Sequence, residues 1–286
     1  MVYPMVWSER TRRASLFRVR LCAYALIKLA KVPPVRSVLQ SVRSTRLGAR
    51  LAQRLLGFRR PFPDREEAAR EAQRYLRIAH DAKANFRDHL HFSVVQRLSD
   101  YPVIFFLSQL EGPFRVFDLG GNFGNSFYCY SRYLRNTDRM TWKVFDLPDT
   151  VRLGARLARR RRVAERLEFT TELKAADEAD VFLASGSLHY FDQPLHEILS
   201  ALDRKPGHVF VNRTPLTAGT PTWTVQDAGF GLATCALHNR DALIAGMASL
   251  DYDLVDEWSI SDMNLEIPLY PELSAPAYSG LYFRRR

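Results

Sequence analysis

Cysteine is scarce in this chain, and its spacing argues against two kinds of small scaffold. The 286 residues include three cysteines that are far apart and form no C-x-x-C pair: Cys22, Cys129 and Cys235. A disulfide framework uses an even set of cysteines in a short chain, and a structural zinc site uses closely spaced ligands. We therefore expect no disulfide framework and no metal site. We predict buried thiols and a reducing, cytoplasmic location.

Long apolar runs are also missing. The longest stretch that is low in charge, residues 21–30, has ten residues and includes Lys28. A membrane-spanning helix needs about 20 apolar residues. No small-residue cleavage site follows this stretch in the arrangement of a signal peptide. The segment therefore predicts neither a transmembrane helix nor a secretion signal.

Acidic residues are almost absent from the first 60 positions. This segment holds fourteen Arg or Lys and one acid, Glu9, for a net charge of +13, which leaves −3 of the total +10 for residues 61–286. Its two predicted helices, divided at Pro33-Pro34, suit a peripheral contact with an anionic membrane, a partner protein, or a solvated cover over the main domain. The sequence leaves these alternatives open. Because the body of the chain is mildly acidic, we predict no nucleic-acid partner.

The chain has enough apolar residues for a large core. Hydrophobic residues make up 47% of the chain and aromatic residues 12%, and the length suits one large α/β domain with an appendage. We expect a basic helical extension over residues 1–60 and a main domain over residues 61–286, with a helical lead-in at 61–112. In the lead-in, Asp64 and Glu67 form a predicted N-capping pair. Predicted helices run from there to about residue 80, over about 84–98, and over 101–110, the last of them buried against the sheet.

From Phe114 onward, strand and helix patterns alternate, which predicts an α/β fold with a Rossmann-like, seven-stranded, mostly parallel sheet and helices on both faces. The predicted strands are near 115–118, 142–146, 167–170, 180–185, 207–212, 253–258 and 278–284. The predicted helices are near 124–135, 150–162, 194–203 and 239–250. No long helix separates the last two strands, so we expect one of them to run antiparallel.

A glycine-rich turn follows the first predicted strand. The strand ends at Asp118, and glycines stand at 120, 121 and 124, before a segment that can form a helix. Glycine lets the backbone approach a ligand closely, and the start of a helix offers unpaired N–H groups. Many such turns bind nothing, so the pattern alone marks only a candidate cofactor site.

Two further polar groups fall at the ends of predicted strands. Asp146 ends the second strand, 28 residues after Asp118, where a carboxylate can accept both hydroxyls of a ribose. The alternative is an N-cap for the next helix, which Asp149 could provide instead. His189 lies in the polar loop after the fourth strand, where its imidazole could take a proton from a hydroxyl or phenol. The alternative for His189 is a hydrogen bond to the loop backbone.

Three segments in this order resemble class I S-adenosylmethionine-dependent methyltransferases: Asp-Leu-Gly-Gly-Asn-Phe-Gly (118–124), Val-Phe-Asp-Leu-Pro (144–148) and Ser-Gly-Ser-Leu-His-Tyr (185–190). The chain resembles most closely a bacterial family of predicted methyltransferases with a basic N-terminal extension, over roughly residues 60–286. It departs from the family's acid-x-Gly-x-Gly-x-Gly pattern at Asn122, which stands where the middle glycine is usual.

The resemblance implies S-adenosylmethionine as cofactor and gives residues their roles. Asp118 and the glycines would hold the methionine part, Asp146 the ribose, and Phe169 would lie near the adenine. The expected cofactor-binding residues are Asp118, Gly120, Gly121, Gly124, Asp146, Leu147, Phe169 and Ser185. His189 matches the histidine that acts as the base in small-molecule O-methyltransferases.

Residues 213–230 are rich in Thr, Gly and Pro and are predicted to form a long loop over the acceptor pocket. We expect Trp223 to pack on the substrate, with Gln226 and Tyr190 also contacting it. The alternative for Trp223 is that it anchors the loop to the core.

The sequence therefore predicts a methyltransferase that acts, through O-methylation, on a small metabolite or a glycan intermediate. The first alternative is a non-catalytic, methyltransferase-like binding module recruited through its basic N-terminus, which the Asn122 departure favours. The second is an NAD-dependent dehydrogenase, but the turn lacks Gly-x-Gly-x-x-Gly and the spacing between the two acids exceeds the roughly 20 residues of that fingerprint. A homodimer is left open.

Overall fold

The computed structural model describes residues 60–73, 95–134, 140–227, 232–265, 267 and 270–286, with a few positions between 34 and 48. The predicted basic helices of the N-terminal extension, and the predicted helices beyond residue 73 and over 84–94, lie outside the described residues. In the described part of the chain, every helix is too short or too polar to cross a lipid bilayer.

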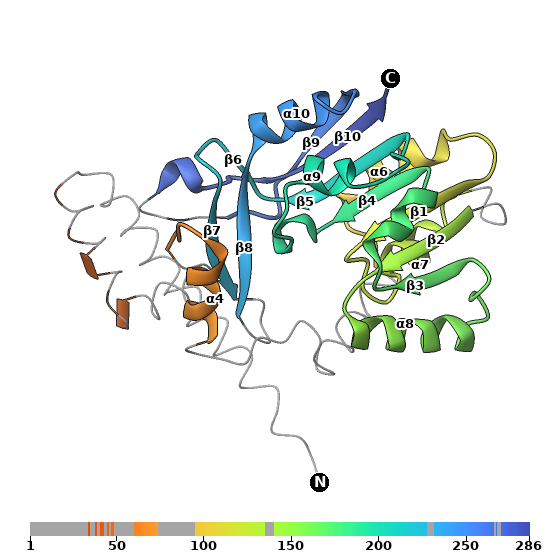
Figure 1. Ribbon diagram of the computed structural model, residues 1–286, viewed down its shortest axis with the longest axis horizontal. Coiled ribbons are helices and arrows are strands. Elements are labelled where there is room, and N and C mark those ends of the chain that lie inside the picture. Colours follow the sequence, from red (N-terminus) through yellow and green to blue (C-terminus); the bar gives the residue numbers. More distant parts are fainter. Residues whose placement is uncertain are drawn as a thin grey trace, which may run out of the picture.

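A seven-stranded sheet forms the centre of the protein, in the order β3-β2-β1-β4-β5-β10-β9 (Figure 1). Its strands are β1 (Phe114–Leu119), β2 (Met140–Phe145), β3 (Leu167–Thr170), β4 (Val181–Ser185), β5 (His208–Thr214), β9 (Tyr252–Ile260) and β10 (Tyr278–Arg285). The first five strands are parallel neighbours, whereas β10 is antiparallel to both β5 and β9. All seven predicted strands, and the predicted antiparallel strand, are confirmed.

Helices cover both faces of this sheet. One face carries α9 (Leu195–Ser200), α10 (Arg240–Ala248) and the 3-10 helix η2 (Leu173–Glu178), and the other carries α6 (Asp100–Ser108), α7 (Asn125–Tyr130) and α8 (Pro148–Arg160). Successive residues of a strand point to opposite faces. Val116 therefore joins the cluster under α6, α7 and α8, while Phe117 joins the cluster under α9 and α10. Cys129 and Cys235 are buried free thiols, as predicted.

A second, three-stranded sheet follows β5, and the prediction of one long loop over 213–230 is wrong. The strands are β6 (Leu216–Thr217), β7 (Thr222–Asp227) and β8 (Leu232–Asn239), in the order β6-β8-β7. Two 3-10 helices lie elsewhere in the chain: η3 (Leu188–Tyr190) follows β4, and η4 (Pro271–Leu273) precedes β10. The β-branched and aromatic residues of Thr222-Trp-Thr-Val are typical of a strand. Pro221 and Gly219 mark turns at its edge.

The helical lead-in packs on this second sheet. Helix α4 (Arg65–Gln73) buries Ala68 and Ala72 in a small cluster with Phe62 and Val225. The predicted N-capping pair is confirmed in part, because the Glu67 N–H donates to Asp64 Oδ1 at 2.7 Å. The Glu67 carboxylate does not complete the capping box and instead pairs with Arg60 at 3.0 Å.

One glycine sets how closely α8 approaches β3. A Cβ atom added at Gly154 would lie 2.3 Å from Cε1 of Phe169, well inside a normal contact. The ring of Phe169 therefore packs directly on the helix backbone.

We expect Gly154→Ala to destabilise the protein by about 1–3 kcal/mol through overpacking, although alanine alone would favour the helix by about 1 kcal/mol. Urea unfolding measures the change. Gly207→Ala is the matched control, because its added Cβ would meet only the Asp180 carbonyl, at 3.8 Å. Equal free energies of unfolding for the two variants would contradict this packing.

Candidate functional site

The order of strands reverses between β1 and β4, since β2 and β3 lie on one side of this point and β5 on the other. In open α/β sheets, ligands bind at such a point, beyond the carboxyl ends of the strands. Here two segments meet: the turn after β1, residues 119–124, and the loop after β4, residues 186–191. The Ser187 hydroxyl donates to the Leu119 carbonyl and joins them.

Two hydrogen bonds tie the turn to the end of β2. The Gly120 N–H donates to the Phe145 carbonyl at 2.8 Å, and the Asn122 N–H donates to Asp146 Oδ2 at 2.9 Å. The turn and the predicted ribose-binding carboxylate are thus held next to each other.

Asn122 adopts a left-handed backbone conformation. Its φ of 55° lies in the left-handed region, which asparagine tolerates better than most side chains. Its side-chain Oδ1 accepts the Phe123 N–H at 3.0 Å. Asparagine at position 122 is therefore compatible with the backbone conformation of this turn.

The neighbouring glycines are required by contacts within the protein. A Cβ at Gly121 would lie 2.5 Å from the Asp118 carboxylate, and one at Gly120 would lie 2.6 Å from Cβ of Ser187. Gly124, with φ +81°, is the N-cap of α7 and packs on Leu167. Glycine in this turn thus lets Asp118, Ser187 and Leu167 pack against its backbone.

Asp118 lies beneath the turn with only 1% of its surface exposed. It accepts a hydrogen bond from Trp142 Nε1 at 3.0 Å. Burial raises the pKa of its carboxyl group to about 7, although the Trp142 hydrogen bond and the charge of Arg213 act in the opposite direction. The described contacts of this predicted cofactor residue are therefore with the core and the turn.

Asp146 is half-buried, and two backbone groups hold its carboxylate. Oδ2 accepts the Asn122 N–H, and Oδ1 accepts the Leu147 N–H at 2.8 Å. These two bonds orient the carboxylate beside the turn. The N-cap of α8 is Leu147, whose side chain is 45% exposed, so Asp146 is not the N-cap. The ring of Phe169 packs on Gly154 of α8.

The residues expected around the acceptor come from two elements, η3 and β7. His189, in η3, is 3% exposed, and its ring centroid lies 4.2 Å from that of Tyr190 and 6.3 Å from that of Tyr278. The Tyr190 hydroxyl donates to Gln226 Oε1 of β7 at 2.7 Å. Trp223 packs on the cluster of Phe62 and α4, which agrees with the anchoring alternative. His189, Tyr190 and Gln226 are thus brought together.

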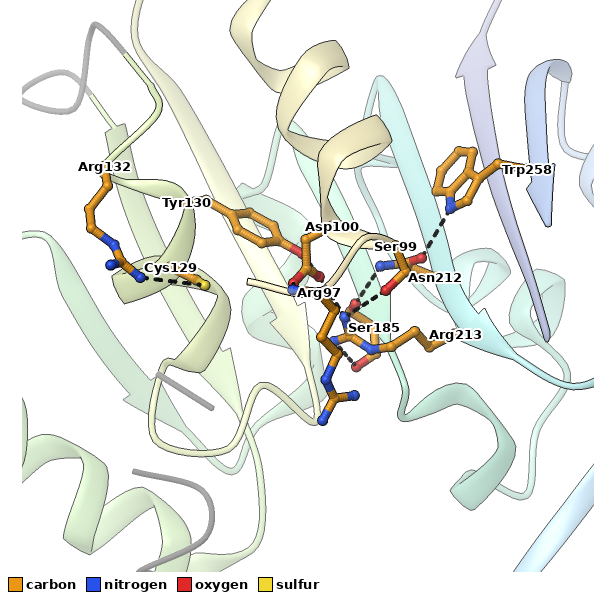
Figure 2. Close-up of polar contacts among 10 residues, drawn as sticks. All are labelled: Arg97, Ser99, Asp100, Cys129, Tyr130, Arg132, Ser185, Asn212, Arg213 and Trp258. Atoms are coloured by element: carbon orange, nitrogen blue, oxygen red, sulfur yellow. Dashed lines mark hydrogen bonds and ion pairs between the residues drawn. The ribbon is translucent and has the colours of Figure 1, made fainter. Parts of the chain in front are cut away.

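A buried polar network beside this edge escaped the sequence analysis (Figure 2). Arg213, near the end of β5, contacts Asp100 Oδ1 of α6 at 2.5 Å, and the Tyr130 hydroxyl donates to the same oxygen at 2.9 Å. Ser185, a predicted cofactor residue, accepts the Asn212 side-chain amide at 3.1 Å. The only sequence signals were one charged residue beside each of two apolar segments: Asp100 at the start of the first and Arg213 near the end of the second.

Arg213 also has a left-handed backbone conformation, with φ 54°. Such strain in a residue other than glycine is found where surrounding contacts fix it, often at functional sites. Burial alone would lower the pKa of Arg213, but Asp100 and Tyr130 outweigh it and raise the pKa. The Arg213 guanidinium therefore stays charged at the edge of the candidate site.

Among the described residues, no group of three or more His, Cys, Asp or Glu could hold a metal ion.

No protein-family model matches this chain, and no curated protein matches it. Similar solved structures include the 1,6-didemethyltoxoflavin-N1-methyltransferase of Burkholderia thailandensis, at 18% identity over 78% of this chain and 91% of that one, with a TM-score of 0.47. Geranyl diphosphate C-methyltransferase of Streptomyces coelicolor A3(2) is 15% identical over 65% and 79%, with a TM-score of 0.47. An S-adenosylmethionine-dependent methyltransferase of Mesorhizobium loti is 15% identical over 65% and 98%, with a TM-score of 0.46. These values are low, so the fold assignment rests on the strand order of the sheet itself.

The raised pKa of Asp118 predicts a pH-dependent stability. The folded protein binds this proton more tightly than the unfolded chain, whose carboxyl has an ordinary pKa near 3.8, so the contribution of Asp118 becomes less favourable as the pH rises from about 4 to about 7. Asp118→Asn keeps an acceptor for Trp142 and removes the charge. We expect the variant to gain stability relative to the natural protein between pH 5 and pH 8, as measured by urea unfolding.

Asp149→Asn is the control, because Asp149 is more exposed and pairs with Arg152 on the surface. Its stability difference should stay constant over the same range. If the difference in unfolding free energy between Asp118→Asn and the natural protein did not change with pH, the pKa of Asp118 would not be raised in the folded protein.

Proposed function

We propose that this chain is an S-adenosylmethionine-dependent methyltransferase. The observation that carries the proposal is the junction of the glycine turn, Asp146 and the loop after β4 at the point where strand order reverses. Backbone bonds orient the Asp146 carboxylate beside a turn that follows the first strand. This is the arrangement that a nucleoside bearing a ribose diol requires.

The residues present fit such a cofactor. Asp146 would accept hydrogen bonds from the ribose hydroxyls, and the exposed side chain of Leu147 would offer an apolar surface beside the base. The turn at 120–124 would border the methionine part. Ser185 and the loop after it would form the opposite border.

The sheet favours this reading over a dinucleotide-binding dehydrogenase. The dinucleotide fold has the parallel order 3-2-1-4-5-6, whereas here the antiparallel β10 separates β5 from β9. The turn also lacks Gly-x-Gly-x-x-Gly. Both features argue against nicotinamide chemistry at this edge.

The non-catalytic alternative rested on Asn122. The φ of 55° at that residue is one that glycine also adopts readily, and the Asn122 N–H still donates to the Asp146 carboxylate. We therefore favour a catalytic domain.

The proposed reaction is transfer of a methyl group to a hydroxyl of a small metabolite or a glycan intermediate. The cofactor supplies a methyl carbon bound to a positively charged sulfur. The acceptor oxygen would form a bond to that carbon while the carbon–sulfur bond breaks, which yields a methyl ether and a thioether. His189 would take the hydroxyl proton. The protein contributes mainly the alignment of oxygen, carbon and sulfur.

The second sheet would form one wall of the acceptor site. The Tyr190–Gln226 hydrogen bond connects η3 to β7, so the acceptor would lie near both. Trp223 would hold this wall against α4. Such a wall suits a small molecule with polar groups, because it offers a phenol and an amide as hydrogen-bonding partners.

Asp146→Ala tests the cofactor assignment. We expect the dissociation constant of S-adenosylmethionine, measured by equilibrium dialysis, to rise more than ten-fold, since two charge-assisted hydrogen bonds are lost. Asp149→Ala is the matched control, because Asp149 stands three residues further on, in the first turn of α8. We expect the dissociation constant of S-adenosylmethionine for this variant to stay within about two-fold of that of the natural protein. Unchanged affinity in Asp146→Ala would contradict the assignment.

His189→Ala tests the base. With phenols and sugar derivatives as acceptors, we expect formation of S-adenosylhomocysteine to fall by 10²-fold or more, the usual contribution of a general base, while cofactor affinity changes little. His196→Ala, on α9, should keep both properties. Full activity in His189→Ala would remove His189 as the base. Lost cofactor affinity would instead indicate a structural role.

A further inference from the structure

One helix carries a concentration of positive charge that the proposed function does not use. Between residues 149 and 166 there are two acids and seven arginines: Arg152, Arg156, Arg159, Arg160, Arg161, Arg162 and Arg166. This gives the segment a net charge of +5, although residues 61–286 as a whole carry −3. The charge belongs to α8 and the turn that follows it.

The α8 arginines form an exposed row. Arg152, Arg156 and Arg159 are spaced by four and three residues, which brings them to one side of the helix, and all are exposed, as are Arg160 and Arg162. Arg152 pairs with Asp149. Within the described part of the chain, no ion pair involves Arg156, Arg159, Arg160 or Arg162. Helix α8 lies at the outer edge of the molecule beside β3 (Figure 1).

An exposed apolar surface lies in the same layer of helices. Leu98, Tyr101 and Phe105, at and before α6, are 79%, 47% and 58% exposed. Helix α6 also buries Val103 and Leu107 against the sheet, so it is apolar on both sides. A helix that is apolar all round is normally covered on both sides.

Contacts through α7 connect the two surfaces. The Arg161 guanidinium lies 4.4 Å from the ring centroid of Tyr128 in α7. Just after α7, Tyr133 is 40% exposed and contacts Tyr101, with ring centroids 6.0 Å apart. Helices α6, α7 and α8 share one core cluster on one face of the sheet. Arginines and apolar side chains thus occupy neighbouring parts of one surface, which we call the α6–α8 face.

We infer that the α6–α8 face docks on the surface of an anionic phospholipid bilayer. Guanidinium groups bind phosphate oxygens in pairs of hydrogen bonds, and clustered basic residues are attracted to anionic lipids. Tyr, Phe and Leu side chains enter the boundary between headgroups and acyl chains. A bilayer therefore satisfies the charge of α8 and the apolar side of α6 together.

A nucleic acid fits this surface less well. Single-stranded nucleic acid would need exposed aromatic rings among the arginines for base stacking. The exposed rings of Tyr101, Phe105 and Tyr133 lie in or near α6 and α7 instead, and Arg161 covers Tyr128. No polyanion would cover the apolar side of α6. The inference does not depend on methyl transfer, and it concerns a surface other than the basic N-terminal extension.

Flotation of the full chain with vesicles tests the inference. We expect binding to phosphatidylcholine vesicles that contain phosphatidylglycerol, little binding to pure phosphatidylcholine, and weaker binding as salt rises. Arg159→Gln with Arg160→Gln should lower the partition coefficient by about ten-fold or more. Arg284→Gln with Arg285→Gln is the matched control, since these two adjacent exposed arginines lie at the end of β10, and should change it less than about two-fold.

Phe105→Ser should also weaken binding to anionic vesicles, although it leaves the charge of the protein unchanged. If the Arg159→Gln, Arg160→Gln variant fails to fold, Arg156→Gln with Arg162→Gln provides the second test. Three results would overturn the inference: no binding to anionic vesicles, equal losses in the α8 and β10 variants, or tighter binding to a DNA or RNA duplex than to vesicles. Circular dichroism of each variant checks its fold.

Discussion

The hydrogen bond from the Asn122 N–H to the Asp146 carboxylate is the interaction on which the candidate site depends. β1 and β2 are parallel, with Leu119 opposite Phe145, so the segments that follow them leave the sheet side by side. The bond fixes the turn against the acid, and the left-handed conformation of Asn122 directs its N–H there. On the other side, Ser187 holds the loop after β4 against Leu119. The geometry that supports a nucleoside cofactor thus comes from links between three strand ends.

Two buried carboxylates, Asp100 and Asp118, border this edge and differ in the groups that compensate their charge. Asp100 is neutralised by Arg213 and receives the Tyr130 hydroxyl. Asp118 accepts hydrogen bonds from the neutral side chains of Trp142 and Ser126 and has a pKa raised to about 7. Breaking a buried ion pair leaves a costly uncompensated charge, so Arg213 and Asp100 stabilise the edge only together. The pair also joins α6 to β5 across the top of the sheet.

The sequence predicted the main sheet well because its strands are short apolar runs separated by helical patterns. It missed β7 and β8, since Pro221, Gly219 and many threonines resemble a loop when their pairing is unknown. The Arg213–Asp100 pair could not be predicted, because it joins residues 113 positions apart. Tyr190 contacts both His189 and Gln226, and the roles expected for these three residues stay predictions. The glycines were expected to admit a ligand, but contacts with Asp118, Ser187 and Leu167 already require them.

Together, the linked turn, acid and loop form the proposed S-adenosylmethionine site. Isothermal titration calorimetry of the full chain with S-adenosylmethionine and, separately, with NAD⁺ is the decisive test. We expect saturable binding of S-adenosylmethionine at one site per chain and no heat with NAD⁺. A folded protein that gives no heat with S-adenosylmethionine, or that binds NAD⁺ instead, would contradict it.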